Sequence, residues 1–262
     1  MKLYKDPILN FTEIFNEKNG LLIRTNILDK NGRETKVEPA MRSFPELIDI
    51  GIMGKCHVNQ MFCKKFGVDC YQANNNYEDM CLDDYKRIID ECKNKTFQVA
   101  LGGRGDPNKH EKFIEILKYT RNNGIIPNLT TTGINITKKE IIAMKKYCGA
   151  VAISMYSKII NINGKLIESN PKSEEAIKKL ISQKITTNVH YVISNETIDD
   201  VITRLENDLF PTGVNAVIFL LYKPVGIATC EKIINIKDEK FKKFINILNS
   251  KKLSEISCDD LM

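Results

Sequence analysis

The stretch LIDIGIM, residues 47–53, decides the fold, because it is the first of several short apolar runs that are each followed by an amphipathic helix pattern. Its helix pattern places Tyr85, Ile88, Ile89 and Cys92 at i, i+3, i+4 and i+7, the spacing of one helix face. Strand-like runs that alternate with helices are typical of a parallel sheet built from βα units. The stretch therefore predicts the first strand of an α/β domain.

Five more apolar runs repeat this pattern toward the C-terminus. The six expected strands are Leu47–Met53, Thr96–Leu101, Ile126–Thr131, Ala150–Met155, Ile185–Ile193 and Val214–Tyr222. Six units are fewer than the eight of a closed TIM barrel, which needs roughly 250 residues. The sequence therefore predicts a partial, open (β/α)6 TIM-like barrel, with ligands at the carboxyl ends of its strands.

The N-terminal residues differ from the repeating units. Leu21–Ile27 and Glu34–Val37 are strand-like, and Asn31-Gly32 between them is a pair favoured in tight hairpin turns. We expect a small β-hairpin extension over residues 1–44, followed by the barrel core and a C-terminal tail over residues 45–262.

The composition is that of a globular protein. Of the 262 residues, 42% are hydrophobic and 27% are charged, which excludes a disordered chain, a collagen and a coiled coil. The longest apolar run, Ala216–Tyr222, is far shorter than the roughly 20 residues of a membrane span. The first residues lack the apolar core of a secretory signal, so we expect a cytoplasmic protein.

The net charge of +6 is spread over 39 basic and 33 acidic residues. The Lys-Lys pairs fall on predicted helix surfaces, which favours solvated helix faces over a nucleic-acid site. Eight cysteines in a chain without an export signal favour reduced thiols, some of them binding metal, over a disulfide framework.

Three of these cysteines share the loop after the first strand. The segment GKCHVNQMFCKKFGVDCYQ, residues 54–72, contains Cys56, Cys63 and Cys70. Thiolates select zinc, copper(I) or iron–sulfur clusters. In a four-iron cluster three protein ligands leave one iron open, whereas structural zinc needs a fourth ligand, for which His57 is the adjacent candidate.

A glycine-rich loop follows the second strand. The segment LGGRGDP, residues 101–107, contains Gly102, Gly103, Gly105 and Asp106. Glycines let the backbone approach a ligand closely, and a carboxylate can accept a hydrogen bond from an ammonium group. Downstream, His110 is expected to be an exposed residue at a helix start.

Together the two loops resemble the radical S-adenosylmethionine (SAM) superfamily, over roughly residues 45–250. The resemblance implies that Cys56, Cys63 and Cys70 hold a [4Fe–4S] cluster. It also implies that the glycine-rich loop, which is similar to a Gly-Gly-Glu-Pro motif with an insertion and aspartate in place of glutamate, contacts the methionyl amino group of SAM. The SAM-binding residues expected on this basis are Gly102, Gly103, Gly105 and Asp106.

Three further SAM or substrate contacts are implied by position in the family. Thr131 belongs to the TTTG ending of the third strand, Ser154 ends the fourth, and His190 interrupts the apolar fifth strand. A satisfied core histidine is an equal alternative for His190.

The cysteine spacing departs from the family pattern. The loop is Cys-x6-Cys-x6-Cys where the family has Cys-x3-Cys-x2-Cys, and Asp69 replaces the usual aromatic residue before the third cysteine. Longer loops can present the same sulfurs, because loop closure costs little per added residue. Seven-residue spacing would also align the cysteines on one helix face, although Gly67 argues against a continuous helix.

The resemblance implies an enzyme in which a reduced cluster cleaves SAM, and the 5′-deoxyadenosyl radical abstracts hydrogen from an unknown small-molecule or peptide substrate. It also implies an electron donor such as a flavodoxin or ferredoxin. Two alternatives remain open: a non-catalytic iron–sulfur or zinc-binding module, and a scaffold that binds RNA or peptide. If the chain continues beyond its last residue, Cys258 could begin an auxiliary-cluster segment.

Overall fold

A six-stranded parallel sheet forms the centre of the protein. The computed structural model describes residues 1–39, 41–56, 76–225 and 228–255. The strands of the sheet are β4 (Leu47–Ile50), β5 (Gln98–Leu101), β6 (Ile126–Thr131), β7 (Val151–Ser154), β10 (Thr187–Ile193) and β11 (Ala216–Leu221). They lie in the order β11-β10-β7-β6-β5-β4, and each neighbouring pair is parallel. All six predicted strands are therefore confirmed.

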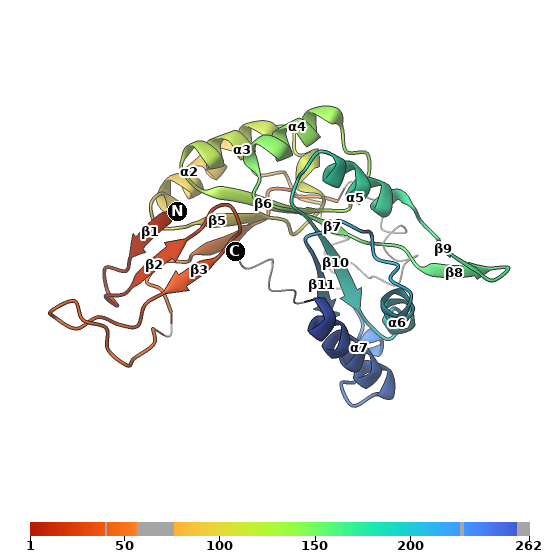
Figure 1. The fold of residues 1–262 in the computed structure, drawn as a ribbon. Coiled ribbons are helices and arrows are strands. Elements are labelled where there is room, and N and C mark those ends of the chain that lie inside the picture. The colour runs from red at the N-terminus through yellow and green to blue at the C-terminus, as the bar shows by residue number, and fades with distance from the viewer. Residues whose placement is uncertain (40, 57–75, 226–227, 256–262) are drawn as a thin grey trace.

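Helices cover the convex face of this sheet (Figure 1). They are α2 (Leu82–Cys92), α3 (Phe113–Asn122), α4 (Lys138–Tyr147), α5 (Lys172–Ser182), α6 (Ile198–Glu206) and α7 (Glu239–Glu255). Right-handed crossovers between parallel strands place successive helices on one side. The sheet is thus a half-barrel, as the partial (β/α)6 barrel predicts. Within the described part of the chain, no helix combines the length and apolar character that crossing a membrane requires.

The two faces of the sheet differ in chemistry. In β5, Val99 and Leu101 are fully buried in the core between sheet and helices, whereas Gln98 and Ala100 line the concave face. Alternate residues of a strand point to opposite faces. In β5 the polar side chain therefore lies on the concave side.

The N-terminal residues form a three-stranded antiparallel sheet, which is more than the expected hairpin. Its strands are β1 (Lys2–Lys5), β2 (Thr12–Phe15) and β3 (Leu22–Arg24). The turn at Asn31-Gly32 is present, but only one isolated bridge, between Leu28 and Glu34, closes around it. Sequence patterning missed β2 because its buried position 13 is a glutamate.

Aromatic and charged contacts attach this N-terminal sheet to the start of β5. The ring of Phe15 stacks on that of Phe97 with centroids 5.0 Å apart. Glu13 is fully buried and pairs with Arg42 at 3.0 Å and Arg24 at 2.7 Å. Burial raises the pKa of the Glu13 carboxyl, against the effect of both arginines. The Arg42 guanidinium also lies 3.6 Å from the centroid of the Tyr4 ring.

Asp6 should make this attachment sensitive to acid. Burial acts to raise the pKa of its carboxyl, but hydrogen bonds from the N–H groups of Leu9, Ser43 and Ile8 outweigh it and lower the pKa to about 2. Because the pKa falls on folding, the stabilisation is present above the unfolded value of 3.8 and is lost as the pH falls toward about 2. We expect Asp6→Asn to lower the free energy of unfolding by about 2 kcal/mol at pH 7.

Urea denaturation at several pH values measures this contribution. The difference between wild type and Asp6→Asn should shrink steadily between pH 4 and pH 2. A difference that stayed constant over this range would show that the carboxylate charge has no part in it.

A hairpin of β8 (Ile159–Ile162) and β9 (Lys165–Glu168) is inserted between β7 and α5. It is held by Arg204, a fully buried residue of α6, which donates hydrogen bonds to Glu168, to Asp200 at 2.6 Å and to the carbonyl oxygen of Ser157 at 3.1 Å. The hairpin is therefore fixed to the helix layer at the carboxyl end of β7.

Candidate functional site

The two ends of the cysteine-bearing loop meet at the carboxyl end of β4. Cys56 is the last described residue before this loop, and Asn76 is the first after it. Four contacts join the two ends: a β-bridge between Lys55 and Asn76, and hydrogen bonds from Tyr77 N to Gly54 O (3.0 Å), Met80 N to Ile52 O (2.9 Å) and Gly54 N to Asp79 Oδ1 (2.7 Å). The described residues on either side of segment 57–75 thus lie together at one point of the rim.

Only one of the three expected cluster ligands can be placed. Cys56 lies on the rim, while Cys63 and Cys70 lie outside the described residues, as does His57. In the described ranges no three histidine, cysteine or carboxylate side chains gather as a metal site. The ligand set therefore stays a prediction, and the described residues locate where the loop begins and ends.

The glycine-rich loop packs directly against Cys56. Gly103 and Gly105 have φ angles of +86° and +72°, a backbone conformation that favours glycine. A Cβ atom at Gly105 would lie 2.5 Å from the carbonyl oxygen of Lys55 and 3.2 Å from the Cα atom of Cys56. Only a residue without a side chain allows this approach. The structure thereby brings two of the sequence-predicted loops together at the carboxyl ends of β4 and β5.

Arg104 and His110 strengthen the junction of the two loops. The Arg104 guanidinium lies 4.6 Å from the centroid of the Tyr77 ring, a cation–π contact between the glycine-rich loop and the returning segment. His110 is only 5% exposed, and its Nε2 lies 2.9 Å from the carbonyl oxygen of Met80. The expectation of an exposed His110 is wrong, because the turn after Asp106 folds the imidazole beneath the returning segment.

Asp106 joins the β5 loop to the β6 loop. Its buried carboxylate accepts hydrogen bonds from the N–H of Thr132 at 2.8 Å and from its hydroxyl at 2.6 Å. An ionised carboxylate has about four acceptor positions, so an ammonium group could still be accepted. The role of Asp106 toward SAM stays a prediction, and Thr132 is a partner that the sequence reasoning missed.

Replacing Asp106 should cost stability whether or not SAM is bound. In Asp106→Ala the buried N–H and hydroxyl of Thr132 lose their acceptor. We expect the free energy of unfolding to fall by about 1.5–3 kcal/mol, the scale of hydrogen bonds to charged groups. Urea denaturation without SAM measures this effect, and unchanged stability would contradict it.

The three residues assigned by position in the strands fall on different faces. Thr131 is 1% exposed on the convex side, where its hydroxyl donates to Asn108 Oδ1 at 2.8 Å. His190 lines the concave face and pairs in register with Ser154 of β7. Burial lowers the pKa of His190, which favours a neutral imidazole at neutral pH. The concave face therefore receives His190 and Ser154, and Thr131 points away from it.

A cavity of about 520 Å³ lies on the concave face below the rim. Its lining includes a row of side-chain amides that the sequence reasoning missed: Gln98, Asn128, Asn188 and Asn215. The signal in the sequence was weak: Gln98 is the single polar residue of QVAL (98–101), and in TNVH (187–190) Asn188 and His190 alternate with Val189. We call these four residues the amide row.

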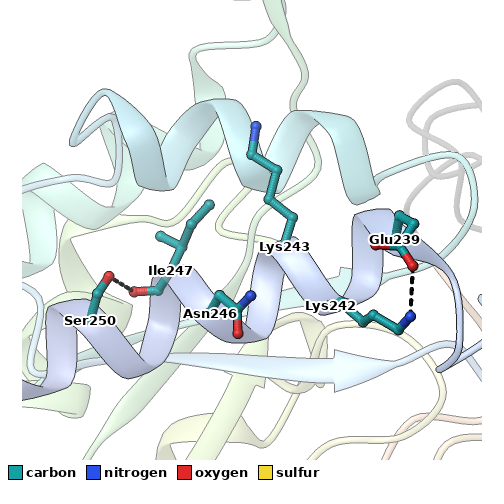
Figure 2. A pocket seen from close by; sticks show the side chains of 6 residues that line it. All are labelled: Glu239, Lys242, Lys243, Asn246, Ile247 and Ser250. Atoms are coloured by element: carbon teal, nitrogen blue, oxygen red, sulfur yellow. Dashed lines mark hydrogen bonds and ion pairs between the residues drawn. The ribbon is translucent and has the colours of Figure 1, made fainter.

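A second hollow, of about 410 Å³, lies on the outer surface of α7 (Figure 2). Its lysines are paired with carboxylates: Lys242 with Glu239 at 2.6 Å, and Lys243 with Glu206 of α6 at 2.7 Å. These lysines form a solvated helix face of mixed charge, as the sequence predicts, and the hollow shares no lining residue with the concave cavity.

Solved structures resemble this fold, although no family model and no curated protein matches the sequence. SuiB of Streptococcus suis bound to S-adenosylmethionine superposes with a TM-score of 0.61 at 17% identity, over 82% of this chain and 49% of SuiB. Native anSMEcpe with bound AdoMet gives a TM-score of 0.57 at 16% identity, over 79% of this chain and 60% of that one.

Both structures contain S-adenosylmethionine and have the radical SAM fold, which this chain shares. The match spans about half the length of SuiB and three fifths of anSMEcpe. Two other structures of these proteins contain peptides: SuiB bound to the precursor peptide SuiA, and anSMEcpe with the Cp18Cys peptide.

Proposed function

We propose that this protein is a radical SAM enzyme whose [4Fe–4S] cluster is held by Cys56, Cys63 and Cys70. The observation that carries the proposal is the packing of Gly105 against Lys55 and Cys56. It puts the glycine-rich loop beside the first cysteine, at the carboxyl ends of two adjacent parallel strands. That edge of a parallel α/β sheet is where ligands bind.

The thiols and the glycine-rich loop that the sequence supplies fit a cluster and a SAM molecule. Thiolates are the usual ligands of a [4Fe–4S] cluster, and three of them leave one iron free for SAM. The chemistry that such a group supplies is one-electron reduction of SAM, which yields methionine and a 5′-deoxyadenosyl radical that abstracts hydrogen from the substrate. The chain's own part is to hold, orient and shield the reactants.

Each placed residue has a defined task in this proposal. Gly103 and Gly105 let the backbone approach SAM, and Gly102 continues the same loop at the end of β5. Asp106 accepts a hydrogen bond from the SAM ammonium while it holds Thr132. His190 and Ser154 face the interior of the half-barrel and contact SAM or substrate. Thr131 supports this wall from the convex side through Asn108.

The substrate that we propose is a peptide. Peptides are bound in the SuiB and anSMEcpe complexes that share this fold. An electron donor such as a flavodoxin or ferredoxin would reduce the cluster.

Anaerobic reconstitution with iron and sulfide tests the proposal. The loaded chain should bind about four irons, show the broad visible absorbance of a cubane cluster, and release 5′-deoxyadenosine from SAM with a strong reductant. A colourless chain that binds zinc, or an iron–sulfur chain that leaves SAM intact, would favour the non-catalytic metal-binding module instead.

A further inference from the structure

The amide row forms two hydrogen-bonded pairs on the concave face. Asn128 Nδ2 in β6 donates to Gln98 Oε1 in β5 at 2.8 Å, and Asn215 Nδ2 donates to Asn188 Oδ1 in β10 at 2.9 Å. Between the two pairs, β7 and the two residues before it present only small side chains to the cavity, at Gly149, Ala150 and Ala152. The row is therefore a polar floor with an open space at its centre.

Part of the hydrogen-bonding capacity of this floor is unused. Asn128 Oδ1 accepts the N–H of Ala150 at 2.9 Å, so Asn128 is largely occupied. The side-chain nitrogens of Gln98 and Asn188 and the side-chain oxygen of Asn215 have no further partner among the residues that the structure describes. Donors and an acceptor in one row complement a ligand that offers both, as an amide group does.

The lining of the cavity is almost uncharged. Of its described residues only Glu17 and Lys18 carry a full charge, and both belong to the turn between β2 and β3. Glu17 is paired with Lys2 at 3.1 Å. The sheet itself contributes amides, hydroxyls, alanines and His190, whose lowered pKa favours the neutral form. A buried charge on the ligand would find no opposite charge on this floor.

We infer that the amide row binds the neutral, amide-bearing end of the substrate, and that the atom to be attacked lies at the rim. This inference rests on the proposed function and specifies its substrate. Gly102 lies four positions beyond Gln98 along an extended strand, so the row lies about 13 Å below the rim. An uncharged extended peptide of about four residues spans that distance.

Binding of a defined probe tests the inference without any turnover. The probe is N-acetyl-trialanine amide, added to the full chain and followed by ligand-observed NMR titration. The variants Gln98→Leu and Asn188→Leu remove the unused donors. The matched control, Asn246→Leu, removes an exposed amide on α7 (Figure 2). Each lost hydrogen bond should weaken binding roughly fivefold, and the control should bind as wild type does.

Two comparison ligands define the chemical class. The same peptide with a free carboxylate in place of its terminal amide should bind at least about fivefold more weakly, because the sheet strands offer it no cation and Lys18 belongs to the turn between β2 and β3. Maltotriose supplies hydroxyl groups in place of amides and should not compete. Failure of the capped peptide to bind, equal binding in both variants, or preference for the carboxylate or the sugar would each overturn the inference.

A failure of this substrate inference can be distinguished from a failure of the proposed radical SAM function. If the peptide does not bind but the reconstituted chain still forms 5′-deoxyadenosine from SAM, the substrate assignment falls and the proposed enzyme stands. If SAM is not cleaved while the capped peptide binds through the amide row, the row is a peptide site in a protein without that chemistry.

Discussion

Cys63→Ala should lose the iron–sulfur cluster almost completely. With two thiolates left, the loop no longer provides the three ligands that leave one iron of a four-iron cluster open. We expect the iron content after anaerobic reconstitution to fall from about four to below one per chain, and 5′-deoxyadenosine formation to fall to background. Iron analysis, visible absorbance and chromatography of the nucleoside measure these effects.

A thiol just beyond the loop provides the matched control. Cys81 is exposed at the start of α2, where its sulfur accepts the N–H of Asp84 at 3.4 Å. Cys81→Ala should keep its full iron content, because the proposal assigns this thiol no metal. Equal iron in the Cys63→Ala and wild-type chains would refute the ligand set, and loss of iron in Cys81→Ala would move the site toward α2.

The strands of the half-barrel were predictable because burial of apolar side chains between the sheet and the helices leaves a local pattern in the sequence. Each strand buries alternate apolar side chains against helices, and each helix carries its own apolar face, so period two and period 3.6 are both visible in the sequence. Cys92 and Cys148 follow the same rule, since both contribute to the core between sheet and helices.

Other elements depend on contacts between residues that are distant in the chain. The β8–β9 hairpin is held by Arg204, which lies 36 residues beyond Glu168. The carboxylate of Asp106 is held by Thr132, 26 residues away. No local pattern encodes such pairs. In the N-terminal sheet, the buried charge of Glu13 replaces the apolar residue that alternation would require.

The sequence was enough to predict which loops form the site, but not which face of the sheet each side chain occupies. The cysteine loop and the glycine-rich loop are conspicuous in composition, and parallel topology places the ends of β4 and β5 side by side. Which face a strand-end residue occupies depends on register, so Thr131 and Thr130 could not be distinguished before the fold was known. The structure shows Thr130 lining the concave cavity and Thr131 bonded to Asn108 on the other side.

Gly105→Ala should impair the site more than its local strain explains. The new Cβ atom would lie 2.5 Å from the carbonyl oxygen of Lys55, so either the glycine-rich loop or the start of the cysteine loop must move. A positive φ also costs stability in any L-residue. We expect about 1 kcal/mol or more of lost stability and at least about a tenfold loss of SAM affinity in the reconstituted protein.

Gly124→Ala separates the effect of backbone strain from the effect of the close contact. Gly124 has a nearly equal φ of +76°, but no atom lies within 4 Å of the position that an added Cβ would take. It should lose a similar amount of stability from backbone strain alone and should bind SAM as wild type does. Urea denaturation gives the stabilities, and equilibrium dialysis with labelled SAM gives the affinities. The same SAM affinity in both variants would mean that close packing of Gly105 on Cys56 does not position SAM. That packing would then no longer support the proposed function.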